Sequence, residues 1–180
     1  MDVDDVLALL ASGAGVASDG EPVDDLAHAL QCATFAVRAA ADDELIVAAA
    51  LHDIGYRPTL RARYADPELP HEEVGARFAS GLFGQRVGWL IAQHVPAKRY
   101  LVATDGHYAA QLSDASMRSL VRQGGAMSSA EIERFEQAPW AGDAAQLRRW
   151  DDLAKVPGAA TLALDELRGP LERVFARHHL

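Results

Sequence analysis

The stretch from Asp42 to Gly55, DDELIVAAALHDIG, decides the fold. Acidic residues stand where a helix would begin, and acids in a first turn suit the helix dipole. The apolar, alanine-rich run that follows predicts a buried helix that its neighbours can approach closely. This run ends in His52-Asp53, whose adjacent side chains can point at two neighbouring metal ions. The stretch therefore predicts a helical protein with its chemistry at the end of one buried helix.

The composition of the 180-residue chain extends this bias. It contains 35 Ala and 21 Leu against 21 Val, Ile and Thr combined, and the first two favour helices whereas β-branched residues favour strands. No segment alternates with a period of two. We predict an all-α fold of seven to nine helices, in one domain spanning residues 1–180. We also predict a helix that ends at residue 94, an irregular loop over residues 57–70 and a C-terminal helix over residues 165–180.

Charge and cysteine content narrow the classes of partner. The chain carries 17 Lys and Arg against 26 Asp and Glu, a net charge of −9, which argues against binding to nucleic acid or to an anionic membrane. No run of 18 apolar residues predicts a transmembrane helix. Cys32 is the only cysteine, and the acidic start at residues 1–5 is unlike a secretory signal. We expect a cytoplasmic protein and leave its oligomeric state open.

Four histidines have settings that suit a metal site. One lies inside a predicted helix, one precedes Asp53, one opens a helix after a proline-rich loop, and one follows 23 residues later. Imidazole and carboxylate together suit iron, zinc, manganese or nickel. A single helical histidine is usually a core or surface residue, but the set is more specific once a distal carboxylate at Asp151 or Asp152 is added. The four are His28, His52, His71 and His94.

The order of these residues resembles a known family. The set His28, His52-Asp53 and Asp151 resembles the HD-domain superfamily of metal-dependent, all-α proteins, and the further two histidines resemble its members with two metals. Over about residues 20–157 the chain is similar to the mixed-valent di-iron oxygenases of the PhnZ type, which cleave carbon–phosphorus bonds; myo-inositol oxygenase is a distant relative. The similar segments are GEPV at 20–23, LAHALQCA at 26–33, HDIG at 52–55, HEEVGA at 71–76, HVPAKRYL at 94–101, LSDAS at 112–116, QGG at 123–125 and RWDDLAK at 149–155.

The resemblance implies an HD-domain helical bundle with a buried dinuclear site for two iron ions, Fe(II) and Fe(III), and O2 as co-substrate. Asp53 would bridge the two irons. Asp151 is preferred to Asp152 because Lys155, four residues later, matches the spacing in the family. The implied ligands are His28, His52, Asp53 and Asp151 for one iron, and His71, His94 and the bridging Asp53 for the other.

The resemblance also implies a set of substrate contacts. Lys98 lies one helical turn after His94 on the same face, where it would pair with a phosphonate oxygen and act with Asp53 as a catalytic residue. Arg148, three residues before Asp151, is the second implied anion contact. A solvated surface charge is the commoner fate of any single Lys or Arg. The remaining implied contacts are Ser116, Gln123, Tyr56 and Glu21.

Two positions depart from the family pattern. Ser18 stands where the phosphonate oxidisers have a lid tyrosine, ten residues before the first metal histidine. Tyr56 stands where they often have a histidine that contacts the substrate. Tyr56 either replaces that imidazole with a phenol or packs. The departures predict the same class of chemistry with a different substrate or a differently gated iron.

The leading hypothesis is an O2-dependent di-iron oxygenase that oxidises a small hydroxylated organophosphonate at C1, giving phosphate and a carboxylic acid. The alternative is an HD-type metal-dependent phosphohydrolase of a small phosphoester or nucleotide, in which the metals activate water. A third is a sensor that kept the metals without turnover. The charge of −9 does not exclude a small anionic substrate, because metal ions and Lys98 dominate the local field.

Overall fold

The computed structural model describes residues 1–18, 20–64 and 66–179. These residues form eleven α-helices and two 3-10 helices. The described part of the chain has no strand; its one β-type contact is an isolated antiparallel bridge between Ala17 and Asp24. The all-α prediction is confirmed, whereas seven to nine helices was too few. Leu180, the last residue of the predicted C-terminal helix, lies outside the described residues.

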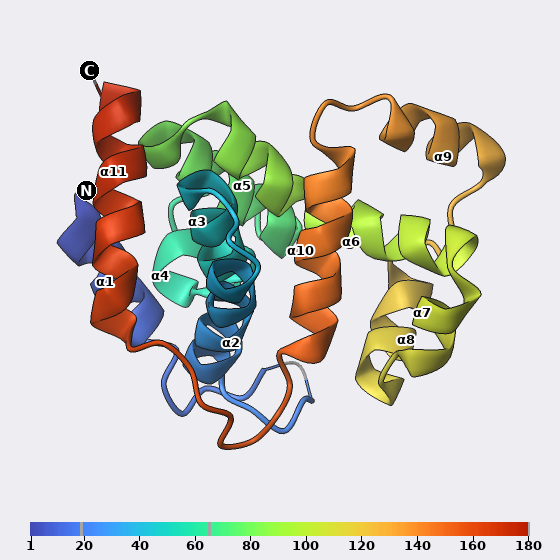
Figure 1. The fold of residues 1–180 in the computed structure, drawn as a ribbon, viewed down its shortest axis with the longest axis horizontal. Coiled ribbons are helices and arrows are strands. Elements are labelled where there is room, and N and C mark those ends of the chain that lie inside the picture. The colour runs from blue at the N-terminus through green and yellow to red at the C-terminus, as the bar shows by residue number, and fades with distance from the viewer. Residues whose placement is uncertain (19, 65, 180) are drawn as a thin grey trace.

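Helix α3 (Asp43–Leu51) occupies the centre of the bundle in Figure 1. It packs against α2, α5, α6, α10 and α11. Every residue from Leu45 to Leu51 is buried, and the three alanines in this run let the neighbouring backbones come close. The other elements are α1 (Val3–Ala11), α2 (Asp25–Arg38), η1 (Ile54–Tyr56), α4 (Pro58–Arg61), α5 (His71–Phe83), α6 (Gln85–Thr104), α7 (Gly106–Gln111), α8 (Asp114–Arg122), α9 (Ser129–Glu136), α10 (Ala141–Leu153), η2 (Leu164–Leu167) and α11 (Arg168–His179).

Helix α6 runs on to Thr104, so the predicted end at His94 was wrong. Pro96 lies inside the helix, where it removes one backbone donor and usually costs about 3 kcal/mol. Packing of α6 against both α5 and α10 outweighs this cost. The continuation has a functional consequence, because it carries Lys98 on the same helix as His94.

Short helices account for most of the missed elements. In the predicted loop over residues 57–70, α4 forms one turn with Pro58 at its first position, where a missing N–H costs nothing, and Leu60 anchors the turn in the core. Helix α7 follows a bend at Asp105, whose side chain accepts hydrogen bonds from the N–H groups of His107 and Tyr108. Too few residues form these turns for a periodic pattern to show.

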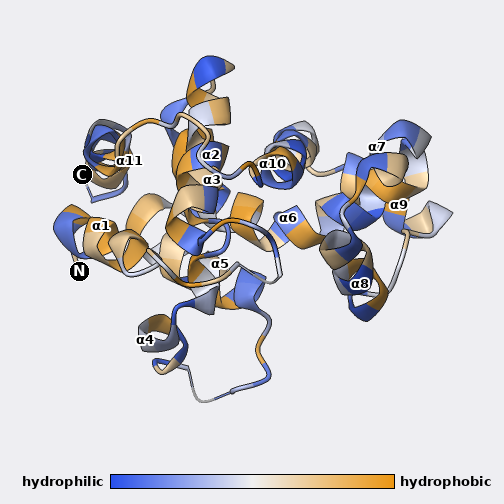
Figure 2. Ribbon diagram, turned by 90° about the horizontal axis from the view of Figure 1, so that it is seen from below, coloured by the Kyte–Doolittle hydropathy of each residue, from blue (hydrophilic) through white to orange (hydrophobic). Residues whose placement is uncertain are grey.

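Helices α7, α8 and α9 lie beyond the C-terminal half of α6, on the side away from α1 and α11 (Figures 1 and 2). The main hydrophobic cluster draws on α1, α2, α3, α5, α6, α10 and α11, and none of its buried described residues comes from α7 or α8. Figure 2 shows the apolar colour densest on α1 and α3. Helices α7 and α8 instead bring polar side chains to one end of the bundle. No described helix is both long enough and apolar enough to cross a membrane.

Candidate metal centre

Four imidazoles meet in two pairs at the end of α3. The Nε2 atoms of His28 and His52 lie 3.1 Å apart, and those of His71 and His94 also lie 3.1 Å apart. Two nitrogens that bind one metal at 2.0–2.1 Å and at right angles are about 3 Å apart. Each pair therefore has the spacing of two ligands on a single ion.

The other ring nitrogen of every histidine has an acceptor beside it. Backbone carbonyls only accept hydrogen bonds, so Nδ1 of His28, His52 and His94 carries the proton and Nε2 offers a lone pair. In the neutral rings two lone pairs face each other, and a cation between them, a proton or a metal ion, resolves the conflict. The acceptors are the carbonyl oxygens of Ala154 (2.9 Å from His28), Ala49 (2.9 Å from His52) and Ile91 (2.6 Å from His94), and Glu72 Oε2 (3.1 Å from His71).

Asp53 lies between the two histidine pairs. Its Oδ2 atom is 3.6 Å from His28 Nε2 and 3.5 Å from His52 Nε2. Its Oδ1 atom is 3.2 Å from His71 Nε2 and 3.6 Å from His94 Nε2. One oxygen faces each pair, which is the arrangement of a carboxylate that bridges two metals. The donor set of this centre thus fits two cations that accept nitrogen and oxygen ligands.

Asp151, rather than Asp152, faces the first histidine pair. Asp151 Oδ1 lies 3.3 Å from His28 Nε2 and 3.7 Å from His52 Nε2. Asp152 turns the other way and forms a two-pronged ion pair with Arg148, with N–O distances of 2.8 and 2.5 Å. All six side chains that the sequence analysis named as ligands therefore converge.

The protonation equilibria of the centre favour positive charge at its middle. Burial alone would lower the pKa of His52, but Asp53 and Asp151 outweigh it and raise the pKa to about 9. Burial would raise the pKa of Asp53, yet His52 and His71 hold it below its usual range. Burial, with His71 and His52 nearby, lowers the pKa of His94 to about 3. The centre attracts a cation, and His94 stays neutral and ready to bind one.

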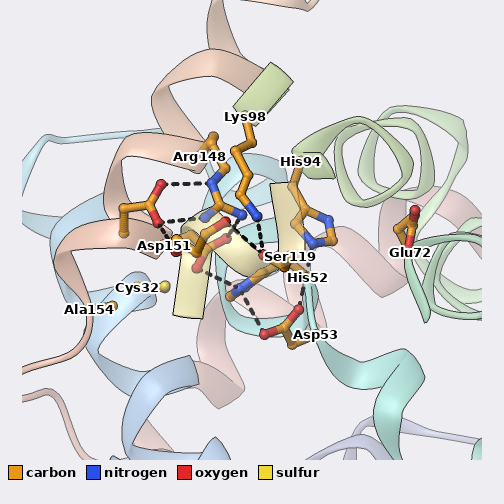
Figure 3. Close-up of polar contacts among 12 residues, drawn as sticks. Cys32, His52, Asp53, Glu72, His94, Lys98, Ser119, Arg148, Asp151 and Ala154 are labelled. Atoms are coloured by element: carbon orange, nitrogen blue, oxygen red, sulfur yellow. Dashed lines mark hydrogen bonds and ion pairs between the residues drawn. The ribbon is translucent and has the colours of Figure 1, made fainter. Parts of the chain in front are cut away.

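Lys98 is nearly inaccessible, with 2% of its surface exposed. Its Nζ donates to Ser119 Oγ at 2.5 Å and to Gln123 Oε1 at 2.9 Å. Burial, helped by Arg148, lowers the pKa of Lys98 to about 8. Figure 3 shows Lys98, Arg148 and His94 pointing toward the space occupied by His52 and Asp53. A buried ammonium with two neutral partners, and with no carboxylate partner among the described residues, is poised to bind an anion.

Arg148 forms ion pairs and hydrogen bonds with three other side chains. Its Nη1 atom contacts Asp151 Oδ2 at 2.7 Å, and its Nε atom donates to Tyr108 Oη at 3.2 Å as well as to Asp152. The guanidinium still lines the cavity in front of the histidines. Arg148 therefore orients Asp151 and also offers charge to a bound anion.

The cavity in front of the centre has a volume of about 60 Å³. Its walls include every substrate contact that the sequence analysis named. Glu21 is held in this wall by Lys155 Nζ at 2.9 Å and by the Ser113 hydroxyl at 2.7 Å. Ser116 accepts from Lys155 at 2.8 Å. The members named earlier are Lys98, Arg148, Ser116, Gln123, Tyr56 and Glu21.

Sequence reasoning missed three polar residues here. Ser119 lies three residues after Ser116 on α8, so helical spacing places them on one face. Glu72 directly follows His71, and no local pattern marks it as the partner of a ring nitrogen. Tyr108, whose hydroxyl donates to Asp152 at 2.5 Å, lies on the unpredicted α7. Cys32 Sγ is 4.0 Å from His28 Nε2 in the core, and burial raises the pKa of its thiol.

Comparison with known proteins agrees with this geometry. Residues 25–121 match the family model of the HD domain, and the chain belongs to the HD-domain family. It is 44% identical over 156 residues to hydroxymethylphosphonate dioxygenase of Gimesia maris, which covers 84% of this chain and 78% of that one. It is 37% identical over 139 residues to [1-hydroxy-2-(trimethylamino)ethyl]phosphonate dioxygenase (glycine-betaine-forming) of Leisingera caerulea, with 76% and 71% covered. The predicted resemblance to the HD-domain phosphonate oxygenases is confirmed.

Proposed function

We propose that this chain is a dioxygenase that oxidises a small hydroxylated phosphonate at C1 and cleaves its C–P bond. The observation that carries the proposal is one cavity that joins a two-metal donor set to two buried cations, Lys98 and Arg148, and to the half-buried Lys155. For the simplest substrate, hydroxymethylphosphonate and O2 give formate and phosphate. One oxygen atom of O2 enters each product, so the reaction needs no further reductant.

We infer iron in both positions, since imidazole and carboxylate suit it. His28, His52 and Asp151 would hold one ion, His71 and His94 the other, and Asp53 would contact both. Bound iron supplies the redox chemistry that activates dioxygen. The donors of this chain fix where that chemistry happens, because each ring is oriented through Nδ1 by an acceptor.

The cationic wall binds and orients the phosphonate. Lys98 Nζ would donate to a phosphonate oxygen, while Ser119 and Gln123 fix the ammonium in place. Lys155 is anchored by Glu21 and Asp152 and adds positive charge beside Ser116. Charge-assisted hydrogen bonds are strong in a site with little water. These side chains hold C1 in one place relative to the metal centre.

Two wider proposals accompany this function. We propose that residues 1–180 act as one domain, since α11 packs on α1, α3 and α5. A cytoplasmic location is supported by the single cysteine, which forms no disulfide within the chain.

The test uses the iron-loaded protein, reduced to the mixed-valent Fe(II)/Fe(III) state, with hydroxymethylphosphonate in air. We expect O2 uptake and phosphate release in equal amounts, and a mixed-valent EPR signal before substrate is added. Asp53→Asn should abolish turnover, whereas Asp114→Asn, on the exposed face of α8, should leave it unchanged. Phosphate release without O2 would instead support the hydrolase. A protein that consumes no O2 with any hydroxylated phosphonate would contradict the proposal.

A further inference from the structure

Tyr56 is held in a fixed position over the metal centre. Its ring stacks on that of His71, with 4.0 Å between centroids and 11° between planes. It ends the 3-10 turn η1, in which its backbone N–H donates to the Asp53 carbonyl oxygen at 3.0 Å. The next residue, Arg57, is buried and ion-paired with Asp25 on α2. The backbone is therefore anchored on both sides of the tyrosine.

Tyr56 and Ser18 stand between two cavities. The inner one is the 60 Å³ space in front of the metal centre, and its walls are mostly charged or polar. The outer one has a volume of about 500 Å³ and includes Val16, Ala17 and Pro58 in its wall. Among the residues that the structure describes, Ser18 and Tyr56 alone belong to both walls. We call these two side chains the partition.

The partition is the wall that separates the inner cavity from the larger outer space. Apart from the partition, every described residue that lines the inner cavity is buried or half-buried, as Lys98, Gln123 and Lys155 are. Ser18 is buried, but Tyr56 is 43% exposed. A substituent too large for the inner cavity can therefore gain space only by displacing the tyrosine ring.

The inner cavity is small for a phosphonate. A cavity of about 150 Å³ holds benzene, which has six heavy atoms. Hydroxymethylphosphonate also has six heavy atoms, so it already fills a 60 Å³ open-sided space and leaves none for a longer chain. We propose that the partition restricts this enzyme to phosphonates that carry only hydrogen and a hydroxyl on C1, with Tyr56 as the specificity-determining residue. The inference rests on the proposed dioxygenase function and names its substrate.

The experiment compares three substrates in air: hydroxymethylphosphonate, 1-hydroxyethylphosphonate and 1-hydroxypropylphosphonate. One methylene is commonly worth about 10- to 200-fold in kcat/KM. We expect the wild-type protein to lose about 100-fold or more from the first substrate to the third. Tyr56→Ala joins the two cavities, and the apolar outer one accepts the alkyl group, so the ratio should shrink to about tenfold or less.

Three further variants separate the causes. Tyr56→Phe keeps the ring and removes the hydroxyl, so it should discriminate as the wild type does. Tyr56→Leu keeps an apolar contact with His71. It therefore controls for the possibility that Tyr56→Ala changes activity by freeing the His71 ring to move. Thr59→Ala, in the outer wall only, is the matched control and should change nothing. Anaerobic calorimetry of the same compounds with the metal-loaded proteins gives a binding series that does not depend on turnover.

The possible results distinguish the steric role of the partition from the proposed dioxygenase activity. A wild-type protein that accepts all three substrates equally, or a ratio that neither Tyr56→Ala nor Tyr56→Leu alters, overturns the partition and leaves the dioxygenase intact. Loss of discrimination in Tyr56→Phe overturns the steric role in favour of a hydrogen bond from the phenol. A wild-type protein that binds the phosphonates by size but consumes no O2 contradicts the proposed function while supporting the partition.

Discussion

Arg148 forms an ion pair with the carboxylate oxygen of Asp151 that faces away from the histidines. Nη1 of Arg148 lies 2.7 Å from Asp151 Oδ2, which leaves Oδ1 toward His28 at 3.3 Å. Burial would raise the pKa of Asp151, but Arg148 and His52 hold it well below its usual range. The proposed ligand is therefore ionised and oriented by a residue that we do not expect to bind metal.

Arg148→Gln should weaken the metal that His28 and His52 hold. Removing one partner of a buried ion pair typically costs about 3–5 kcal/mol, so we expect a lower Tm as well as less metal per chain. Metal analysis and thermal unfolding check both. Arg149→Gln is the matched control, because its side chain is partly exposed and pairs with Asp105. Full metal content in Arg148→Gln would show that Asp151 needs no such support.

Gly55→Ala should disturb the second metal position. A Cβ at Gly55 would overlap the carbonyl oxygen of His71 and lie 2.7 Å from its carbonyl carbon. Backbone atoms cannot swing aside as side chains do, so the start of α5 must shift. We expect loss of the ion at His71 and His94 with the other ion retained, measured as metal stoichiometry falling from two per chain toward one.

The control for this variant lies on α5, the helix whose first residue a Cβ at Gly55 would meet. Nothing lies within 4 Å of a Cβ at Gly81, and replacing a helical glycine with alanine stabilises by about 0.5–1 kcal/mol. Gly81→Ala should therefore bind both metals and unfold at a slightly higher temperature. Equal metal loss in both variants would mean that α5 as a whole, rather than the Gly55 contact, is sensitive.

The sequence was sufficient for the helical class because the buried run in α3 has no competing pattern. It also supplied the six converging side chains, since histidines and aspartates stand out in so alanine-rich a chain. It could not supply the length of α6, because the local rule for Pro96 is overridden by packing that only the tertiary structure shows.

The residues that contact the predicted ligands are harder to predict, because many of these contacts join different helices. Tyr108 reaches Asp152 across 44 positions of sequence, and no periodic pattern links them. The ion pairs of Arg148 with Asp151 and Asp152 differ from this contact, because they join residues three and four positions apart on α10 and follow from helical spacing. Local spacing identifies residues on one helix face, whereas contacts between helices depend on how the helices cross.

Glu72 should tune the metal position at His71. Its Oε2 lies 3.1 Å from His71 Nδ1, and such outer carboxylates commonly affect metal affinity by about 10- to 100-fold. We expect Glu72→Gln to weaken binding of one ion by about tenfold or more, because an amide accepts a hydrogen bond more weakly than a carboxylate. Titration with a competing chelator measures this. Glu73→Gln, next in sequence and exposed, should bind both ions as the wild type does.

The charge on Lys98 should set the basic limb of the pH profile. Burial, with Arg148 nearby, lowers the pKa of Lys98 to about 8, so the free enzyme loses this ammonium as the pH rises through that value. Because the charged form binds the anion, kcat/KM for a phosphonate should be highest below pH 8 and fall about tenfold per pH unit above it. At saturating substrate the limb should move to higher pH, because the bound anion stabilises the charged form.

Lys98→Arg separates this group from others that titrate nearby. A guanidinium stays charged throughout the measured range, so the limb near pH 8 should disappear even if the variant is slower overall. Lys98→Met should lose about 100-fold or more in kcat/KM at pH 7, since an ammonium–phosphonate contact in a buried site is worth about 3 kcal/mol. A basic limb that persists unchanged in Lys98→Arg would assign that titration to another group, and would remove Lys98 as the residue whose charge binds the phosphonate.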